Sequence, residues 1–204
     1  MQFEPIPHYE YTKAITIPDD PKIRKTLVDK LLAPYKFSML MGLSCCGKST
    51  FLDSYTGRVN WSLTKWNRDN VFNMVFQDGT RVEKFYGYMN EFEGRLFPEL
   101  FNRDTHQVVV EGWNLVPSGR TRYMNYFTKS LGRSAIFVFD GPVEEIVKRN
   151  QEAKRLYIPE NEVEIFIRNK YNGTVWPTFD EGWDDIYYIN TFGGRGTRYL
   201  QKKL

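Results

Sequence analysis

The residues from Gly42 to Ser49 have the order Gly-Leu-Ser-Cys-Cys-Gly-Lys-Ser. This spacing is typical of a loop whose backbone N–H groups point inward and cradle the phosphates of a nucleoside triphosphate. In such a loop the lysine reaches the β- and γ-phosphates and the last hydroxyl binds Mg²⁺. We therefore predict that the nucleotide contacts Gly42, Ser44, Cys45, Cys46, Gly47, Lys48, Ser49 and Thr50.

The segments on either side of this loop have the character that the motif requires. Tyr35 to Met41 has the apolar composition of a buried strand, and a helical segment begins near Lys48. A helix that begins at the loop adds the positive end of its dipole to the phosphate site. This context favours a phosphate-binding loop over a chance glycine-rich turn.

Asp69 is a candidate base for an acceptor hydroxyl. It belongs to Asn67-Arg68-Asp69, which follows a short segment, Trp61 to Thr64, that could form the next strand. A carboxylate at the carboxyl end of a strand faces the ligand crevice in open α/β folds, and it could take the proton of an attacking hydroxyl. Alternatively, Asp69 caps a helix that begins at Asn70. The sequence pattern leaves both interpretations open.

Two further charged features could act on the triphosphate. Glu111 directly follows the apolar run His106 to Val110, where an acid often holds Mg²⁺ through water, although it could also be an ordinary surface glutamate. The predicted helix from Pro142 through Lys154 has cations at its distal end. These could close over the triphosphate as a lid, or they could form a solvated face. The cations are Lys148, Arg149, Lys154 and Arg155.

The remaining elements alternate between strands and helices, which predicts an α/β fold with a parallel sheet covered on both faces. The other predicted strands are Ser134 to Phe139 and Ile186 to Ile189, and their short continuous apolar runs suit strands buried on both faces. The other predicted helices are Pro21 to Leu32, Val82 to Leu100 and Gly119 to Leu131. We expect a lead-in with a helix over 1–34, one domain over 35–192 and a basic tail over 193–204.

The composition places limits on the class of protein. With 41% hydrophobic and 16% aromatic residues, the chain can bury a sizeable core, and a net charge of +3 is too small to indicate nucleic-acid binding by itself. The two cysteines are adjacent, which suggests reduced thiols. No run approaches the roughly 20 apolar residues of a membrane span. Because Met1 to Asp20 has no signal-peptide core, we expect a cytoplasmic protein, in the host cytoplasm if the protein is viral.

Four blocks between about Phe37 and Pro159 together resemble the bacteriophage polynucleotide kinase family of P-loop kinases. They are the loop described above, Asn67-Arg68-Asp69, Asn114-Leu-Val-Pro117, and Val138-Phe-Asp140-Gly-Pro142 leading into Val147-Lys-Arg149-Asn150. Beyond them, Pro177-Thr-Phe-Asp-Glu181-Gly182-Trp183-Asp184 is similar to a signature near the end of related small kinases. The resemblance implies a three-layer α/β/α kinase with a mainly parallel central sheet and a helical lid. It also implies that Asp69 is the general base and Arg149 a lid arginine that contacts phosphate.

The chain departs from this family mainly on the acceptor side. The family has an arginine three residues after the catalytic aspartate, used to grip the acceptor's phosphate, and that position is Phe72 here. The second lid arginine falls on Ala153, so Lys154 or Arg155 would have to replace it. We therefore expect catalytic roles for Lys48, Asp69, Arg149 and Arg155, and Mg²⁺ binding by Ser49 and Glu111. The expected acceptor contacts are Arg68, Phe72, Trp113 and Asn114.

These observations predict an ATP- and Mg²⁺-dependent kinase that transfers the γ-phosphate to an alcohol hydroxyl of a nucleic acid or nucleotide. A polynucleotide 5′-hydroxyl and a hydroxymethylated pyrimidine (5-hydroxymethyluracil) in phage DNA are close alternatives. The second is favoured if Trp66, Phe72 or Trp113 stacks on a base, although core packing would explain each aromatic residue singly. A nucleoside or nucleotide kinase and a non-catalytic nucleotide-dependent switch are further alternatives. The tail over 193–204 could grip a nucleic-acid backbone, or it could be a solvated end.

Overall fold

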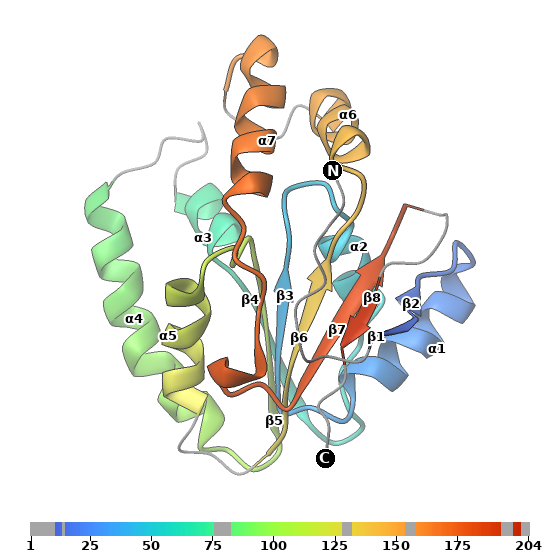
Figure 1. Ribbon diagram of the computed structural model, residues 1–204. Coiled ribbons are helices and arrows are strands. Elements are labelled where there is room, and N and C mark those ends of the chain that lie inside the picture. The colour runs from blue at the N-terminus through green and yellow to red at the C-terminus, as the bar shows by residue number, and fades with distance from the viewer. Residues whose placement is uncertain are drawn as a thin grey trace.

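The computed structural model describes residues 11–13, 15–75, 83–127, 132–153, 158–192 and 198–200. Its centre is a parallel sheet with the strand order β4-β5-β3-β6-β7 (Figure 1). Two short strands pair with the outer edge of β7: β2 runs parallel near its end, and β8 runs antiparallel near its start and also pairs with β1. The strands are β1 Tyr11–Lys13, β2 Ile15–Thr16, β3 Phe37–Met41, β4 Ser62–Asn67, β5 His106–Gly112, β6 Ser134–Phe139, β7 Asp185–Asn190 and β8 Arg198–Leu200.

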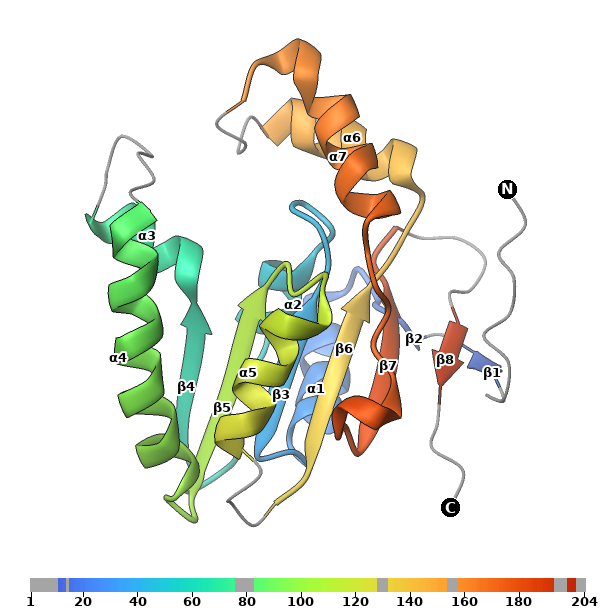
Figure 2. The ribbon, with the colours of Figure 1, turned by 60° about the vertical axis from the view of Figure 1, so that its left-hand side comes forward.

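Helices cover both faces of the sheet and form a three-layer α/β/α architecture. One face packs on α4 (Glu83–Phe101) and α5 (Pro117–Phe127), and the other on α1 (Pro21–Leu32) and α2 (Lys48–Asp53). The three remaining helices lie at the carboxyl ends of the strands (Figure 2). They are α3 (Arg68–Val75), α6 (Val143–Ala153) and α7 (Val163–Asn172), and short 3₁₀ turns span Glu160–Glu162 and Phe179–Glu181.

Burial on both faces explains the apolar strand sequences. Every residue of β3 and β6 is buried, and Met39 of β3 lies between Val110 of β5 and Ile136 of β6. Successive side chains of a strand point to opposite faces, so each central strand contributes to both cores. The predicted parallel α/β sheet is confirmed.

The predicted elements agree with the structure apart from their ends. Helix α1 has the predicted bounds, and the Asp20 side chain caps it by accepting from the N–H groups of Lys22 and Ile23 at 2.8 and 3.0 Å. Residue 82 and residues 128–131, which belong to two predicted helices, lie outside the described residues. Helix α7 and strands β1, β2 and β8 were not predicted.

The motif from Pro177 to Asp184, near the carboxyl end of the chain, makes contacts that hold the fold together. Glu181 forms an ion pair with Arg120, a side chain with no exposed surface, at 2.5 Å. Trp183 Nε1 also donates to Glu181, at 3.2 Å. Asp184 accepts from the N–H group of Ser134, where β6 begins, at 2.7 Å. The segment therefore fixes α5 and β6 to the loop before β7.

The structure describes part of the predicted lead-in (1–34) and part of the predicted tail (193–204). β2 lies against β7, and Ile15 and Ile17 pack against the core on the α1 side of the sheet. β8 falls within the predicted tail, and the rest of 193–204 lies outside the described residues. No helix in the described part of the chain is long and apolar enough to cross a membrane.

Candidate active site

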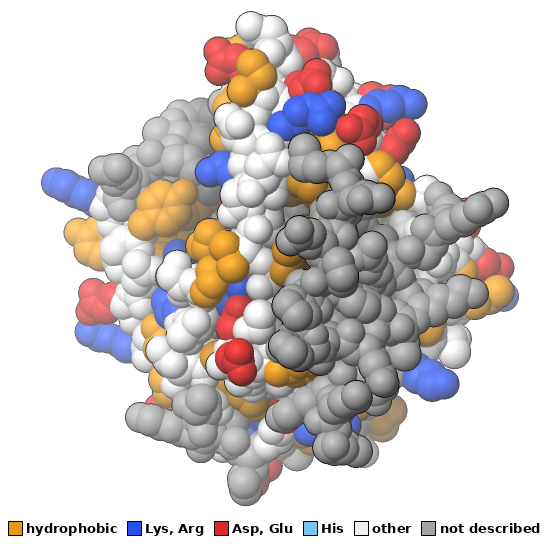
Figure 3. Space-filling view, in the orientation of Figure 1, with side chains coloured by type: hydrophobic (Ala, Val, Ile, Leu, Met, Phe, Trp, Pro, Cys, Tyr) orange, Lys and Arg blue, Asp and Glu red, His pale blue; other side chains and the backbone are white. Residues whose placement is uncertain are grey.

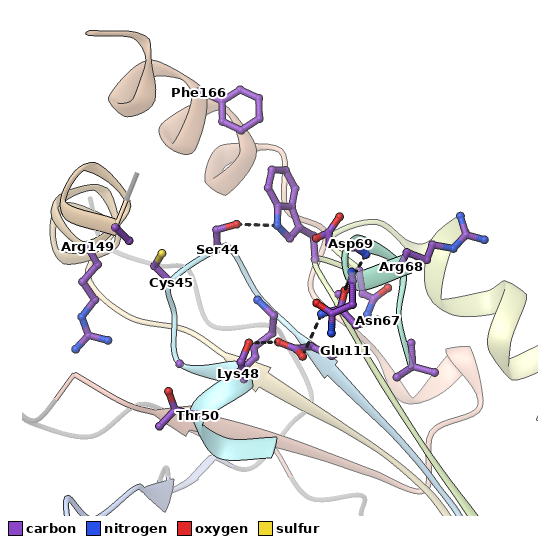
Figure 4. A pocket seen from close by; sticks show the side chains of 18 of the residues that line it. Ser44, Cys45, Lys48, Thr50, Asn67, Arg68, Asp69, Glu111, Arg149 and Phe166 are labelled. Carbon is purple, nitrogen blue, oxygen red and sulfur yellow. Dashed lines mark hydrogen bonds between the residues drawn. The ribbon is translucent and has the colours of Figure 1, made fainter. Parts of the chain in front are cut away.

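A cavity of about 1280 Å³ opens at the carboxyl ends of β3, β4 and β5 (Figure 4). Its wall is made by the loop after β3, the start of α3, the end of β5 and parts of α4, α5, α6 and α7. It holds Lys48, Ser49, Asp69, Glu111 and Arg149, which are the predicted catalytic and metal-binding residues that the structure describes. Arg155 lies outside the described residues.

The loop between β3 and α2 is wound tightly against its neighbours. A Cβ on Gly42, whose φ is 151°, would lie 2.6 Å from the carbonyl oxygen of Phe139. A Cβ on Gly47, whose φ is 97°, would lie 2.8 Å from the Thr191 side chain. Side chains are thus excluded at both positions, and Cys45 between them also has a positive φ of 60°. The glycine spacing of the sequence motif follows from these close approaches.

Lys48 is held inside this loop. Its side chain is buried, and Nζ donates to the carbonyl oxygens of Gly42 and Leu43 at 2.7 and 2.6 Å. Among the described residues, no carboxylate forms an ion pair with it. A buried cation whose partners are neutral carbonyls suits an anionic ligand, such as a phosphate chain.

The two cysteines belong to this loop and are not joined in a disulfide. Cys46 is fully buried, and burial raises the pKa of its thiol. Cys45 and Ser44 line the cavity. The predicted reduced state agrees with this arrangement.

Ser49 and Glu111 meet at the cavity floor. Ser49 Oγ donates to Glu111 Oε1 at 2.6 Å, and Asn67 Nδ2 donates to Glu111 Oε2 at 3.1 Å. A hydroxyl and a carboxylate are oxygen ligands of the kind that Mg²⁺ prefers. Within the described residues there is no group of three or more His, Cys, Asp and Glu side chains that could hold a metal ion. Mg²⁺ here would therefore also need phosphate oxygens and water, as is usual in nucleotide sites.

The N-cap of α3 is Asn67 and not Asp69. Asn67 Oδ1 accepts from the N–H groups of Asp69 and Asn70 at 2.8 and 3.3 Å. The helix consequently begins at Arg68, two residues before the predicted start at Asn70. The alternative that Asp69 caps this helix is thus wrong, and Asp69 lies in the first turn and lines the cavity (Figure 4).

Arg68 is anchored on a buried glutamate. Glu93 of α4 has no exposed surface and accepts hydrogen bonds from Trp66 Nε1 at 2.7 Å, Tyr123 OH at 2.8 Å and Arg68 Nε at 2.7 Å. Arg68 Nη2 also contacts the second oxygen of Glu93. Burial acts to raise the pKa of Glu93, but hydrogen bonds from Arg68 and Tyr123 and the charge of Arg122 outweigh it and lower that pKa.

The sequence analysis missed both Glu93 and Arg122, another arginine in the cavity wall. A signal for Glu93 existed, because it lies between Met89 and Phe97 on the buried stripe of α4 at helical spacing. A carboxylate on an apolar stripe needs a partner in the fold. Arg122 had no comparable signal, since exposed arginines are common on helices.

Two aromatic residues that could have stacked on an acceptor base, Phe72 and Trp66, are packed within the fold instead. Phe72 is 1% exposed and packs on the rings of Phe85 and Tyr86, with centroids 5.1 and 4.6 Å away, so it cannot stack on an acceptor base. The prediction for Phe72 is therefore wrong: it fixes α3 against α4. Trp66 packs against the core on the α4 side of the sheet.

Trp113 and Asn114 do line the cavity. Trp113 Nε1 donates to Ser44 Oγ at 3.2 Å, and its ring lies 5.8 Å from that of Phe166 on α7. Asn114 Nδ2 donates to the carbonyl oxygen of Leu40 at 3.2 Å. Trp113 thus connects the phosphate-binding loop to α7.

Helices α6 and α7 stand over the cavity as a lid. Asn150 of α6 is buried and donates to the carbonyl oxygen of Ser44 at 2.9 Å. Arg168 of α7 pairs with Glu164 at 2.8 Å and with Glu144 of α6 at 3.3 Å. Acidic and basic side chains alternate over the outer surface of these helices (Figure 3).

Arg149 lies on the opposite side of the loop from Asp69 (Figure 4). Its Nη2 donates to the carbonyl oxygen of Thr191 at 3.3 Å, and its guanidinium lies 4.0 Å from the ring centre of Phe192. Arg149 and Thr50 also line a smaller cavity of about 140 Å³, together with Ile17 and Pro18 of the lead-in. The lead-in therefore reaches the loop between β3 and α2 on the side where Arg149 lies.

Comparisons with known proteins identify solved structures that have a similar fold. No model of a protein family matches the chain, and no curated protein sequence matches it. Among solved structures, Kti12 from Chaetomium thermophilum in complex with ADP-AlF3 aligns with a TM-score of 0.51 at 14% identity, over 76% of this chain and 88% of that one. A chain of the Pnkp1/Rnl/Hen1 RNA repair complex aligns with a TM-score of 0.54 at 20% identity. That alignment covers 84% of this chain but only half (50%) of the other. The chain therefore shares its fold with both of these structures.

Proposed function

We propose that this protein is an ATP- and Mg²⁺-dependent kinase that phosphorylates a hydroxyl of a nucleic acid or nucleotide, with a polynucleotide 5′-hydroxyl as the first candidate acceptor. The proposal depends above all on one observation. Asp69 lines the same cavity as the phosphate-binding loop, while Asn67 caps the helix. Asn67 thus supplies the helix cap, and Asp69 lies in the wall of the cavity in which an acceptor would bind.

The donor side suits a triphosphate. The loop excludes side chains at Gly42 and Gly47, and Lys48 is a buried cation with neutral partners. Ser49 and Glu111 would hold Mg²⁺, which would neutralise charge on the β- and γ-phosphate oxygens. Lys48 would exchange its bonds to the loop carbonyls for stronger charge-assisted bonds to phosphate.

On the acceptor side, Asp69 orients the hydroxyl and accepts its proton as the oxygen attacks the γ-phosphorus. The bond between the γ-phosphorus and the β–γ bridging oxygen breaks, and ADP leaves. Arg149 is the candidate lid cation for the equatorial oxygens. To reach them it would leave Thr191 and Phe192, and the single hydrogen bond of 3.3 Å to a carbonyl oxygen opposes this movement only weakly.

A second candidate acceptor is a hydroxymethylated pyrimidine base in DNA. The cavity volume exceeds the roughly 300–1000 Å³ of common ligand pockets, and Trp113, Phe166 and Tyr86 supply aromatic surface in its wall. An unstacked base could lie on such a surface. The RNA repair complex that contains one structural neighbour favours the first candidate by analogy alone.

The test is a transfer assay with γ-labelled ATP and three acceptors. These are a 5′-hydroxyl oligonucleotide, the same oligonucleotide blocked at its 5′ end and carrying 5-hydroxymethyluracil, and a mixture of nucleosides. Label on the unmodified 5′ end supports the polynucleotide kinase, and label confined to the modified base supports the second candidate. ATP hydrolysis that no acceptor accelerates, with no label transferred, would contradict a kinase and favour the nucleotide-dependent switch.

A further inference from the structure

Arg68 and Arg122 form a paired cation site in the cavity wall, beside Asp69. Arg68 begins α3, and Arg122 comes from α5, far away in the sequence. Both line the cavity, with side-chain exposures of 22% and 29%. Arg68 directly precedes Asp69, so the pair adjoins the place where an acceptor hydroxyl would lie.

Shared partners hold the two guanidinium groups together. Arg68 Nη2 and Arg122 Nη1 donate to the same oxygen of Asn90, at 2.5 and 2.8 Å. Arg122 Nη2 also lies 3.6 Å from Glu93 Oε2, the oxygen that Arg68 Nη2 contacts. The two like charges repel each other, and the carboxylate of Glu93 offsets part of this repulsion.

Glu93 does not neutralise the pair. It carries one negative charge, shared between two guanidinium groups, while Trp66 and Tyr123 also donate to its Oε1. The Nε atom of Arg122 is buried and has no hydrogen-bond partner among the described residues. Two guanidinium charges against one carboxylate leave this pair with a net positive charge, which suits an anion with several oxygens.

We propose that Arg68 and Arg122 bind a phosphate group of the acceptor, next to the hydroxyl that is phosphorylated. This proposal depends on the proposed function and specifies its substrate: the acceptor carries a phosphate near its hydroxyl, as a nucleoside 3′-phosphate or the first phosphodiester of a strand does. Phe72 supplies no cation at its position and supports Tyr86 instead. The second cation, Arg122, comes from α5, which is far from Asp69 in the sequence.

The experiment compares two acceptors, thymidine and thymidine 3′-monophosphate, with wild-type protein and three variants. Arg122→Gln should raise the KM for thymidine 3′-monophosphate about ten-fold or more, because it removes charge-assisted bonds to the phosphate. The KM for thymidine and for ATP should change less than about two-fold. Arg122→Lys keeps the charge and should recover most of the loss. Arg95→Gln is the matched control, because Arg95 is an arginine of α4 whose side chain is 80% exposed and pairs with Glu91.

A binding measurement makes the proposal independent of turnover. Fluorescein-labelled 3′-phosphorylated oligonucleotide is titrated in a salt series and followed by anisotropy. Arg122→Gln should reduce the slope of log K against log salt by about 0.7 to 1, and Arg95→Gln should leave the slope unchanged. Circular dichroism melts establish that each variant is folded.

The two measurements separate the possible failures. If no acceptor is labelled but Arg122→Gln alone loses salt-dependent binding, the kinase proposal fails and the phosphate site stands. If Arg122→Gln raises the KM for thymidine as much as for its 3′-phosphate, or if Arg95→Gln behaves in the same way, the phosphate site is overturned. Unchanged binding and kinetics in folded Arg122→Gln would overturn it as well.

Discussion

Three consecutive residues at the end of β4 have three different tasks. Asn67 caps α3 and also donates to Glu111, Arg68 is anchored on Glu93, and Asp69 lines the cavity. The capping amide removes the need for a carboxylate at the helix start.

We predict that Asp69→Asn lowers kcat for phosphoryl transfer by about 10²- to 10⁴-fold, because the amide cannot accept the proton of the acceptor hydroxyl. The dissociation constant for ATP should stay nearly unchanged, since the proposed nucleotide site lies on the other side of the cavity. Single-turnover transfer with labelled ATP and a separate nucleotide titration measure the two quantities.

The control for this variant is Asp104→Asn, an exposed aspartate just before β5, at the opposite end of the sheet. It makes the same chemical change away from the cavity and should retain wild-type kinetics. Full activity in Asp69→Asn would show that the base is another residue or none.

At the scale of elements, the lid is connected to the phosphate-binding loop through buried contacts. Asn150 ties α6 to the carbonyl oxygen of Ser44, and Trp113 connects Ser44 Oγ to Phe166 of α7. The ion pairs of Arg168 with Glu144 of α6 and with Glu164 of α7 itself are exposed, so solvent screening leaves them little effect on the position of the lid. The geometry of the lid over the loop therefore depends on Asn150 and Trp113 more than on its surface charges.

We predict that Asn150→Ala raises the KM for ATP about two- to ten-fold, because one or two buried hydrogen bonds of roughly 1 kcal/mol each are lost and the loop is less well held. Steady-state kinetics at saturating acceptor measure the change. Gln151→Ala removes a neighbouring amide on the same helix that does not line the cavity, and it should behave like wild type. An equal effect of both variants would mean that the helix, and not this contact, is responsible.

At the scale of the whole molecule, buried charges join segments that are distant in sequence. Arg120 on α5 pairs with Glu181 before β7, and it also donates to the carbonyl oxygens of Asn114 and Val175 at 2.8 and 3.0 Å. Glu93 in turn joins α4, α5 and the end of β4. An unpaired charge buried in either place would destabilise the fold. These pairs therefore favour one arrangement of the helices on the sheet.

We predict that Glu181→Ala lowers the free energy of unfolding by about 3 to 5 kcal/mol, because Arg120 would remain buried without its carboxylate. Glu164→Ala, which breaks an exposed ion pair with Arg168, should lower it far less, because solvent screens that pair. Urea denaturation of both variants and wild type gives the comparison. Similar losses in the two variants would contradict the assigned role of the buried pair.

His106 gives the fold a pH dependence. Burial, assisted by the positive charges of Arg103 and Lys36, lowers the pKa of His106 below its ordinary value of 6.5. The unfolded chain then binds more protons than the folded chain between these two pKa values. The stability linked to His106 is therefore fully present above about pH 6.5 and decreases as the pH falls toward the folded value.

We predict that wild type loses more stability than His106→Gln when the pH is lowered from about 8 to about 5.5. Urea denaturation at both pH values measures the two losses. Glu93, whose pKa is lowered, contributes to pH dependence only in more acidic solution, below its ordinary value of 4.5. Equal losses in wild type and His106→Gln would show that His106 titrates alike in the folded and unfolded chain.

The sequence by itself determined the parallel α/β fold, the phosphate-binding loop and the order of the central elements. These features are local: a buried strand is a short apolar run, helix α1 has its own cap in Asp20, and the loop requires glycine where Gly42 and Gly47 touch their neighbours. Local patterns suffice when the physical cause lies within a few residues along the chain. Asp69 and Glu111 were likewise found as candidates, because Asp69 comes just after β4 and Glu111 lies near the end of β5, at the same edge of the sheet.

Only the tertiary structure decided which residues share the cavity wall. Asn67 was shown to be the cap, a role that the sequence had offered to Asp69, and Phe72 a packing residue where an acceptor contact was predicted. The positions of helix α7, Glu93 and Arg122 around the cavity depend on contacts between segments that are far apart in the chain. Whether a carboxylate is buried, and whether two arginines face one oxygen, depends on how α4 and α5 pack together. The hydrophobic periodicity of a single sequence does not predict how two helices pack against each other.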